Sequence, residues 1–179
     1  YGFVHGVLNT DNVLVTGETI DYGPCAFLDT FDRNKTFSSI DAKGRYSYNA
    51  QPDVMLWNMH RLFDAVEPLL TDLTLSSNDD TSHKNVVREQ MGRAYNDSFQ
   101  LTILDCMYRR LGITTMRQAG GDITLDQSQR LVGELLQAME ESKSDYNYSF
   151  MTLEWYLFSL ERNIDWVAGG ALGAWLRAN

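Results

Sequence analysis

Near its N-terminus the chain reads His5-Gly6-Val7-Leu8-Asn9-Thr10-Asp11-Asn12, and shortly afterwards it reads Ile20-Asp21-Tyr22-Gly23. Between these segments, β-branched residues flank Thr16-Gly17-Glu18, a pattern that predicts two short strands joined by a tight turn. Because the strands of a hairpin lie side by side, Asn12 and Asp21 are expected near one another although nine positions separate them. The chemistry of this chain is therefore expected within residues 1–24.

The pair of side chains at the ends of this hairpin suits a hard cation. Mg²⁺ prefers oxygen ligands, keeps several waters and takes few protein ligands in addition to substrate phosphates. Asn12 and Asp21 are thus candidate metal ligands, and Asp11 adds a second carboxylate. The residues alone leave a plainer interpretation open, because Asp, Asn and Gly are also the ordinary residues of turns.

Charge and cysteine content exclude several classes of protein. The 179 residues include 24 acidic and 15 basic side chains, a formal net charge of −9. Neither a nucleic acid nor a membrane is therefore expected as a partner. Cys25 and Cys106 form neither a disulfide framework nor a zinc-ligand spacing, which favours an intracellular location. Because the chain begins at Tyr1 and not at Met, we expect it to be an interior piece of a longer protein.

After the hairpin the pattern becomes that of a long loop and then a helical body. From Pro24 to Ala50 no periodicity is sustained, and ordered loops of this length are usually functional. Pro52 suits a first helical turn, and the apolar residues after it recur at helical spacing. Residues 71–82 are expected as a polar surface connection. Further helices are predicted over 84–111, from a cap at Asp126 to Met139, over 150–160 with much of the circumference buried, and over 166–178.

The order of these features matches the catalytic segment of protein kinases, in which H-R-D-x-x-x-x-N precedes D-F-G. When the two are aligned on His5, Asn12 stands seven residues later, as the pattern requires, and Asp21 begins the D-F-G-like element. The position two after His5 is Val7, where kinases have the Asp that accepts the proton of the substrate hydroxyl. The spacing therefore predicts a chain that holds Mg-nucleotide without the usual general base.

In detail, residues 5–12 and 19–24 resemble the selenoprotein O family. Gly44-Arg45-Tyr46, Gln51-Pro52, Trp57-Asn58 and Arg61-Leu62 extend the resemblance to about Leu70, and residues 84–179 are compatible with the helical C-lobe of that family. The resemblance implies an α+β, protein-kinase-like fold that is mostly helical. Residues 1–24 are then the catalytic and metal-binding segment with its hairpin, residues 25–50 an activation-type loop, and residues 51–179 the helical body. The N-lobe is expected to be absent from this chain.

Members of this family act as protein adenylyltransferases, which transfer AMP from ATP to Ser, Thr or Tyr hydroxyls of proteins. The resemblance implies that Asn12 and Asp21 bind Mg²⁺ or Mn²⁺, that Asp21 also lies near the ATP phosphates, and that Asp11 accepts the proton. ATP and protein substrates are the expected partners. The expected location is the cytoplasm of a bacterium or the mitochondrion of a eukaryote. The piece by itself is expected to be inactive.

Two other functions remain open on the sequence. A catalytically silent, nucleotide-binding pseudokinase scaffold is favoured by Val7 at the position of the usual base. A phosphotransferase would share the His-Gly and Asp-aromatic-Gly elements. Such enzymes normally keep the Asp that Val7 replaces, which disfavours this alternative.

Overall fold

The computed structural model describes residues 1–73, 80–112 and 124–161, and these residues form two compact units. The α1 unit consists of Val4–Ala26 and Thr36–Gln100. The α3–α4 unit consists of Tyr1–Phe3, Phe27–Lys35 and the described residues from Leu101 onward. Each unit has its own core and is considered separately below.

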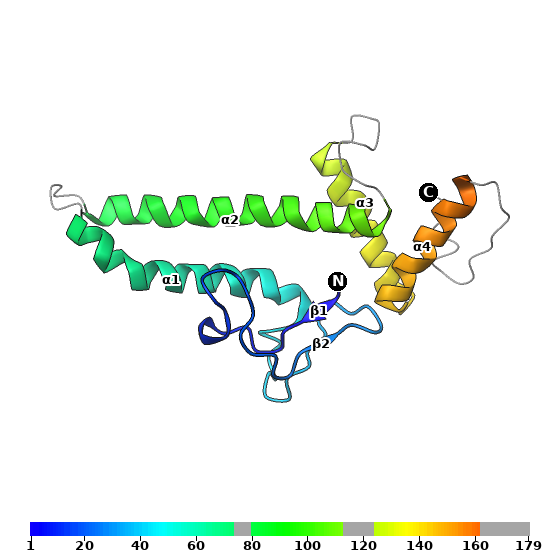
Figure 1. The fold of residues 1–179 in the computed structure, drawn as a ribbon, viewed down its shortest axis with the longest axis horizontal. Helices are drawn as coiled ribbons and strands as arrows, with labels where there is room; N and C mark the ends of the chain where they lie inside the picture. The colour runs from blue at the N-terminus through cyan, green and yellow to red at the C-terminus, as the bar shows by residue number, and fades with distance from the viewer. Residues whose placement is uncertain (74–79, 113–123, 162–179) are drawn as a thin grey trace. The chain divides into compact units, whose positions relative to one another are not determined.

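The described residues are mostly helical, with one small antiparallel sheet, which confirms the predicted α+β class (Figure 1). The sheet pairs strands β1 (Phe3–Val4) and β2 (Ala26–Phe27), and two short 3₁₀ helices are η1 (Thr10–Asn12) and η2 (Tyr48–Ala50). The α-helices are α1 (Gln51–Leu73), α2 (Asp80–Arg110), α3 (Leu125–Glu141) and α4 (Tyr146–Glu161). None of the helices in the described part of the chain combines the length and apolar character that a membrane crossing requires.

Helix α1 begins where the sequence predicted, with Pro52 in its first turn, where the missing N–H of proline costs no hydrogen bond. In the α1 unit it runs antiparallel to the first part of α2 (Figure 1). Two ion pairs join the helices, from Lys84 to Glu67 at 2.7 Å and from Arg88 to Asp64. Near the start of α1, the Tyr95 hydroxyl donates to the Pro52 carbonyl at 2.9 Å. Burial, together with the charge of Asp53, raises the pKa of Tyr95, so the phenol stays protonated as a donor at neutral pH.

The start of helix α3 corrects the sequence prediction. Asp126 was expected to cap this helix, but the cap is Thr124, and Asp126 lies in the first turn. The Thr124 hydroxyl oxygen accepts from the Gln127 backbone N–H at 3.2 Å, and the Gln127 side chain accepts from the Thr124 N–H at 2.8 Å. This reciprocal arrangement satisfies two backbone donors at once, whereas a single acidic cap would satisfy one.

Tyr146 lies at the centre of the α3–α4 unit and is completely buried. Its ring stacks on Phe31 at a centroid distance of 5.6 Å and meets Phe150 edge-on at 5.2 Å. The backbone around it is also held, because the Tyr146 N–H donates to the Asp29 carbonyl at 2.6 Å and the Phe31 N–H to the Ser144 carbonyl at 2.9 Å. The segment from Phe27 to Lys35 is thereby fastened to the start of α4.

Other helix predictions were partly wrong or lie outside the described residues. The helix expected over 84–111 begins at Asp80, and residues 71–73 of the expected connection are helical. In α4 the buried side chains among residues 146–156 follow one face, with Met151 and Trp155 exposed, so burial there covers less of the circumference than predicted. The helix expected over 166–178 lies outside the described residues.

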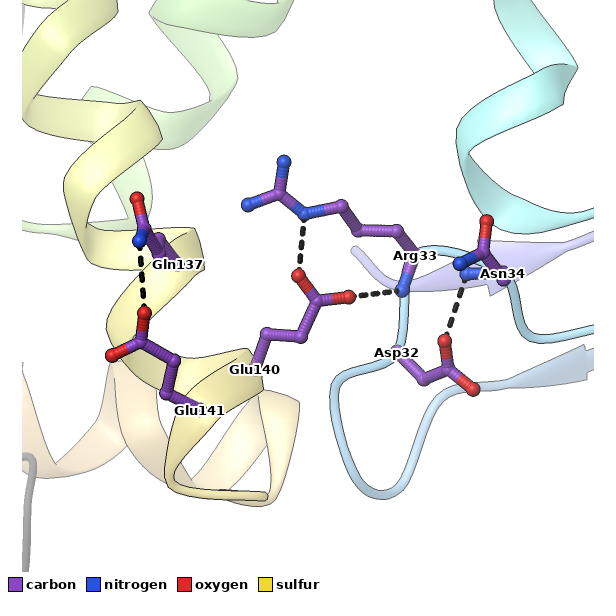
Figure 2. Close-up of polar contacts among 6 residues, drawn as sticks. All are labelled: Asp32, Arg33, Asn34, Gln137, Glu140 and Glu141. Carbon is purple, nitrogen blue, oxygen red and sulfur yellow. Dashed lines mark hydrogen bonds and ion pairs between the residues drawn. The ribbon is translucent and has the colours of Figure 1, made fainter.

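A carboxylate on α3 forms a further link to the 27–35 segment (Figure 2). Glu140 accepts from the Arg33 backbone N–H at 3.1 Å and pairs with Arg33 Nε at 2.7 Å. The neighbouring Glu141 instead accepts from Gln137 on the same helix, at 2.8 Å. The two adjacent glutamates therefore differ in one respect: only the Glu140 contacts cross from α3 to the loop.

We expect Glu140→Gln to raise the hydrogen-exchange rate of residues 27–35, because the amide keeps the size of Glu140 but loses its charge. Both partners are about one-third exposed or more, so the expected loss in local opening free energy is only about 0.5–1 kcal/mol. The measurement is hydrogen-exchange mass spectrometry on the full-length protein. Glu141→Gln is the matched control, and equal exchange in the two variants would contradict the prediction.

Candidate functional site

The predicted catalytic segment forms a loop that ends in the short helix η1 (Thr10–Asn12). The Asn12 N–H donates to the Asn9 carbonyl at 3.1 Å and closes this turn. The Asn9 side chain does not cap the helix; its Oδ1 accepts instead from the Tyr46 hydroxyl. Asp11 lies in the exposed part of this turn, and Asn12 is half-buried.

The predicted hairpin follows η1 and is confirmed, although as one bridge and not two extended strands. Val13 and Thr19 form an antiparallel bridge, and the Leu14 N–H donates to the Glu18 carbonyl at 3.0 Å. Gly17 makes the turn at a φ of +83°, in the left-handed region that glycine enters without strain. The Ile20 N–H donates to the Asn12 carbonyl at 3.4 Å. The backbone of Asn12 therefore lies opposite Ile20, which is the residue directly before Asp21.

The two motifs also approach each other at a second point. Gly6 has a φ of +82°, and a Cβ built at this position would lie 2.6 Å from the Pro24 carbonyl oxygen. No real side chain tolerates such a distance to backbone, so glycine is required for this close approach. The loop before η1 and the turn after Asp21 are thus in contact.

The oxygen donors of this site fit the chemistry of Mg²⁺. Asn12 Nδ2 donates to the Val7 carbonyl at 2.9 Å, which orients the amide and leaves its Oδ1 as an acceptor. Asp11 and Asp21 are exposed, and within the described residues neither carboxylate forms a hydrogen bond or an ion pair. One amide oxygen and one or two carboxylates, completed by water and phosphate oxygens, make an ordinary magnesium environment.

The donor set is small for a protein-only metal site. Across residues 1–73, 80–112 and 124–161, no three or more His, Cys, Asp or Glu side chains gather in a way that could hold a metal ion. A cation held here would therefore depend on a bound nucleotide for several of its ligands, as Mg²⁺ commonly does in phosphate-transfer sites.

Among the described residues, three side chains that the sequence had assigned no role hold the predicted catalytic loop in place. The Gln51 Oε1 accepts from the His5 backbone N–H at 2.9 Å, and Asn58 Nδ2 donates to the Leu8 carbonyl at 3.1 Å. Tyr46 makes the third contact, to Asn9. All three belong to the short motifs that carried the family resemblance, which is the signal that could have identified them. Asn58 is only 6 % exposed, so its contact is a buried one.

His5 itself occupies a structural position. Its side chain is 2 % exposed, and its Nδ1 accepts from the Val7 backbone N–H at 3.3 Å. Val7 therefore takes part in the loop through its backbone, and it brings no proton acceptor to the position where kinases have one.

Comparisons with known proteins found a family model and several curated relatives that match this chain. A family model described as protein adenylyltransferase SelO matches residues 1–165. The chain is 43% identical over 152 residues to protein nucleotidyltransferase YdiU of Methylorubrum populi, and the match covers 85% of this chain and 28% of that protein. The protein of the same name from Agrobacterium fabrum is also 43% identical, with the same coverage. The one from Clostridium perfringens is 37% identical over 161 residues, covering 90% of this chain and 30% of that protein.

Proposed function

Because the chain belongs to the SelO family of protein adenylyltransferases, we propose that the full-length protein transfers AMP from Mg-ATP to Ser, Thr or Tyr hydroxyls of other proteins. The chain spans about 28% of the length of its curated relatives, so this proposal concerns the full-length protein. The observation that carries it is the hairpin, in which the Asn12 carbonyl accepts from the N–H of Ile20, the residue before Asp21. Within the described residues, the Asn12 Oδ1 and the Asp21 carboxylate have no hydrogen-bond partner.

In the proposed reaction each residue has one role. Asn12 Oδ1 and the Asp21 carboxylate would hold Mg²⁺, and the ion would supply positive charge against the ATP phosphates. Asp11 accepts the proton of the acceptor hydroxyl as that oxygen bonds to the α-phosphorus. The bond between the α-phosphorus and the bridging oxygen breaks, and pyrophosphate leaves with the electron pair. Transfer of this kind depends mostly on positioning and charge neutralisation.

We infer further that the α1 unit is the kinase-like part of a C-lobe. What supports this is the order of loop, η1, hairpin, Asp-Tyr-Gly turn and long loop leading into α1. The proton acceptor differs from that of a kinase, since Val7 replaces the usual Asp and Asp11 lies in the exposed turn of η1. Val7 also favours the second candidate, a nucleotide-binding scaffold without activity.

Labelled ATP separates these functions in the full-length protein. With Mg²⁺ or Mn²⁺ present, we expect label from the α-phosphate, and none from the γ-phosphate, to appear on protein substrates together with released pyrophosphate. Transfer of the γ-label would indicate a phosphotransferase. Nucleotide binding without transfer of either label would indicate a scaffold. Either of the last two results would overturn the proposal.

A further inference from the structure

Two guanidinium groups of the α1 unit lie against the same indole ring. The guanidinium carbon of Arg45 is 4.8 Å from the centroid of the Trp57 ring, and that of Arg61 is 5.4 Å from it. All three side chains are exposed, Trp57 to 41 %. Stacking on an indole restrains a guanidinium in a defined orientation while its N–H donors stay available at the edge. We call these three residues the arginine–tryptophan cluster.

The two arginines of the cluster differ in their pairing with carboxylates. Asp64 pairs with Arg61 at 2.8 Å and also with Arg88, so one carboxylate serves two guanidinium groups. The two oxygens of Asp41 accept from the backbone N–H groups of Arg45 and Tyr46, each at 2.8 Å, and not from the Arg45 guanidinium. Within the described residues Arg45 forms no ion pair. In a chain of net charge −9, Arg45 is thus an exposed guanidinium that is open to a carboxylate.

The cluster is joined to the candidate catalytic loop from two sides. Tyr46, next to Arg45, donates its hydroxyl to Asn9, directly before η1. Asn58, next to Trp57, donates to the Leu8 carbonyl at 3.1 Å. Both contacts lie inside the α1 unit, so Arg45 and Trp57 are each one residue from a side chain that holds the loop carrying Asp11.

We propose that the arginine–tryptophan cluster binds acidic side chains of the protein substrate close to the acceptor hydroxyl, with Arg45 as the main contact. This inference rests on the proposed function for the identity of the substrate. Arg61 and Arg88 both pair with the Asp64 carboxylate, which indicates that a carboxylate is the ligand that Arg45 lacks. A chain that is acidic elsewhere repels an acidic partner except at such a point, so the cluster would set the register of the bound substrate.

The test uses the full-length protein and two fluorescent peptides, each with one Ser acceptor flanked by three Glu or by three Gln. Binding is measured by anisotropy without ATP. We expect the Glu peptide to bind the unmodified protein about tenfold more tightly, as one charge-assisted contact would give, and Arg45→Gln to remove this preference. Arg93→Gln is the matched control, because Arg93 is an exposed arginine of the same unit that pairs with Glu89 at 3.1 Å.

Equal binding of the two peptides by the unmodified protein would overturn the proposal, as would a preference that survives Arg45→Gln. A rise in the KM for ATP with unchanged peptide binding would assign Arg45 to nucleotide phosphates and overturn it too. A failure of AMP transfer would contradict the proposed function. Because peptide binding is measured without ATP, it would still show whether the arginine–tryptophan cluster binds acidic side chains.

Discussion

Replacing Asp21 with asparagine in the full-length protein is expected to lower kcat for AMP transfer by about 100-fold or more, the usual effect of removing one group that stabilises charge in the transition state. The substitution keeps the size of the side chain and removes an anionic oxygen. Because the proposed site supplies Mg²⁺ with few protein ligands, the loss of this one should also raise the Mg²⁺ concentration needed for half-maximal rate. Both quantities come from initial rates measured with α-labelled ATP over a series of Mg²⁺ concentrations.

The control for this variant lies on the same hairpin. Glu18 is an exposed carboxylate whose Oε2 accepts from the Thr16 hydroxyl at 2.8 Å, and Glu18→Gln makes the same change of charge. It should leave both the rate and the Mg²⁺ dependence nearly unchanged. Asp11→Asn should lower kcat without altering the Mg²⁺ dependence, since Asp11 is assigned to the proton. Full activity of Asp21→Asn would show that the metal assignment is wrong.

Replacing Tyr146 with alanine is expected to destabilise the α3–α4 unit by about 3–5 kcal/mol, as for other large buried aromatic residues. Tyr146 has no exposed surface and contacts both Phe31 and Phe150. It also packs against Gly2, where an added Cβ would lie 2.6 Å from Tyr146 Cδ1, so backbone closes one side of the cavity and limits its collapse. The measurement is hydrogen exchange of α4 and residues 27–35 in the full-length protein.

Tyr148→Ala is the control for this experiment, because Tyr148 lies on the same helix and is 68 % exposed. Its truncation should change stability by less than about 0.5 kcal/mol. If both variants exchange at the same rate, the assignment of Tyr146 to the core is wrong. If Tyr146→Ala slowed folding but left hydrogen exchange unchanged, the packing of the unit would be intact. That result would also contradict the expected loss of stability.

Some features were predictable because they depend on neighbouring residues. The turn at Gly17 follows from a flexible residue between two β-branched segments, and the start of α1 follows from Pro52. The true cap of α3 was also readable, since Thr124 and Gln127 have the spacing of a capping box. Asp126 lies two residues further along, in the first turn, where an acidic side chain also suits the helix N-terminus.

Other features could not be read from neighbouring residues. The apolar content of residues 150–160 predicted a helix buried on much of its circumference, yet Met151 and Trp155 are exposed. A helical pattern indicates which residues share a face, but the number of faces that are covered depends on which other elements pack against the helix. The hydrogen bond from the Tyr108 hydroxyl to Ser128, at 2.9 Å in the α3–α4 core, is another contact that no local sequence pattern predicts.

The amino-acid sequence by itself determined the family, the helical body and the hairpin that brings Asn12 toward Asp21, because these depend on residue types at short, regular spacings. Only the tertiary structure decided what holds the predicted catalytic loop and which side chains lie beside it. Gln51 and Asn58 reach the loop across 46 and 50 positions of the chain. Such contacts are selected by the packing of whole elements, and so the roles of these residues, and of Arg45 beside them, emerge only once the chain is folded.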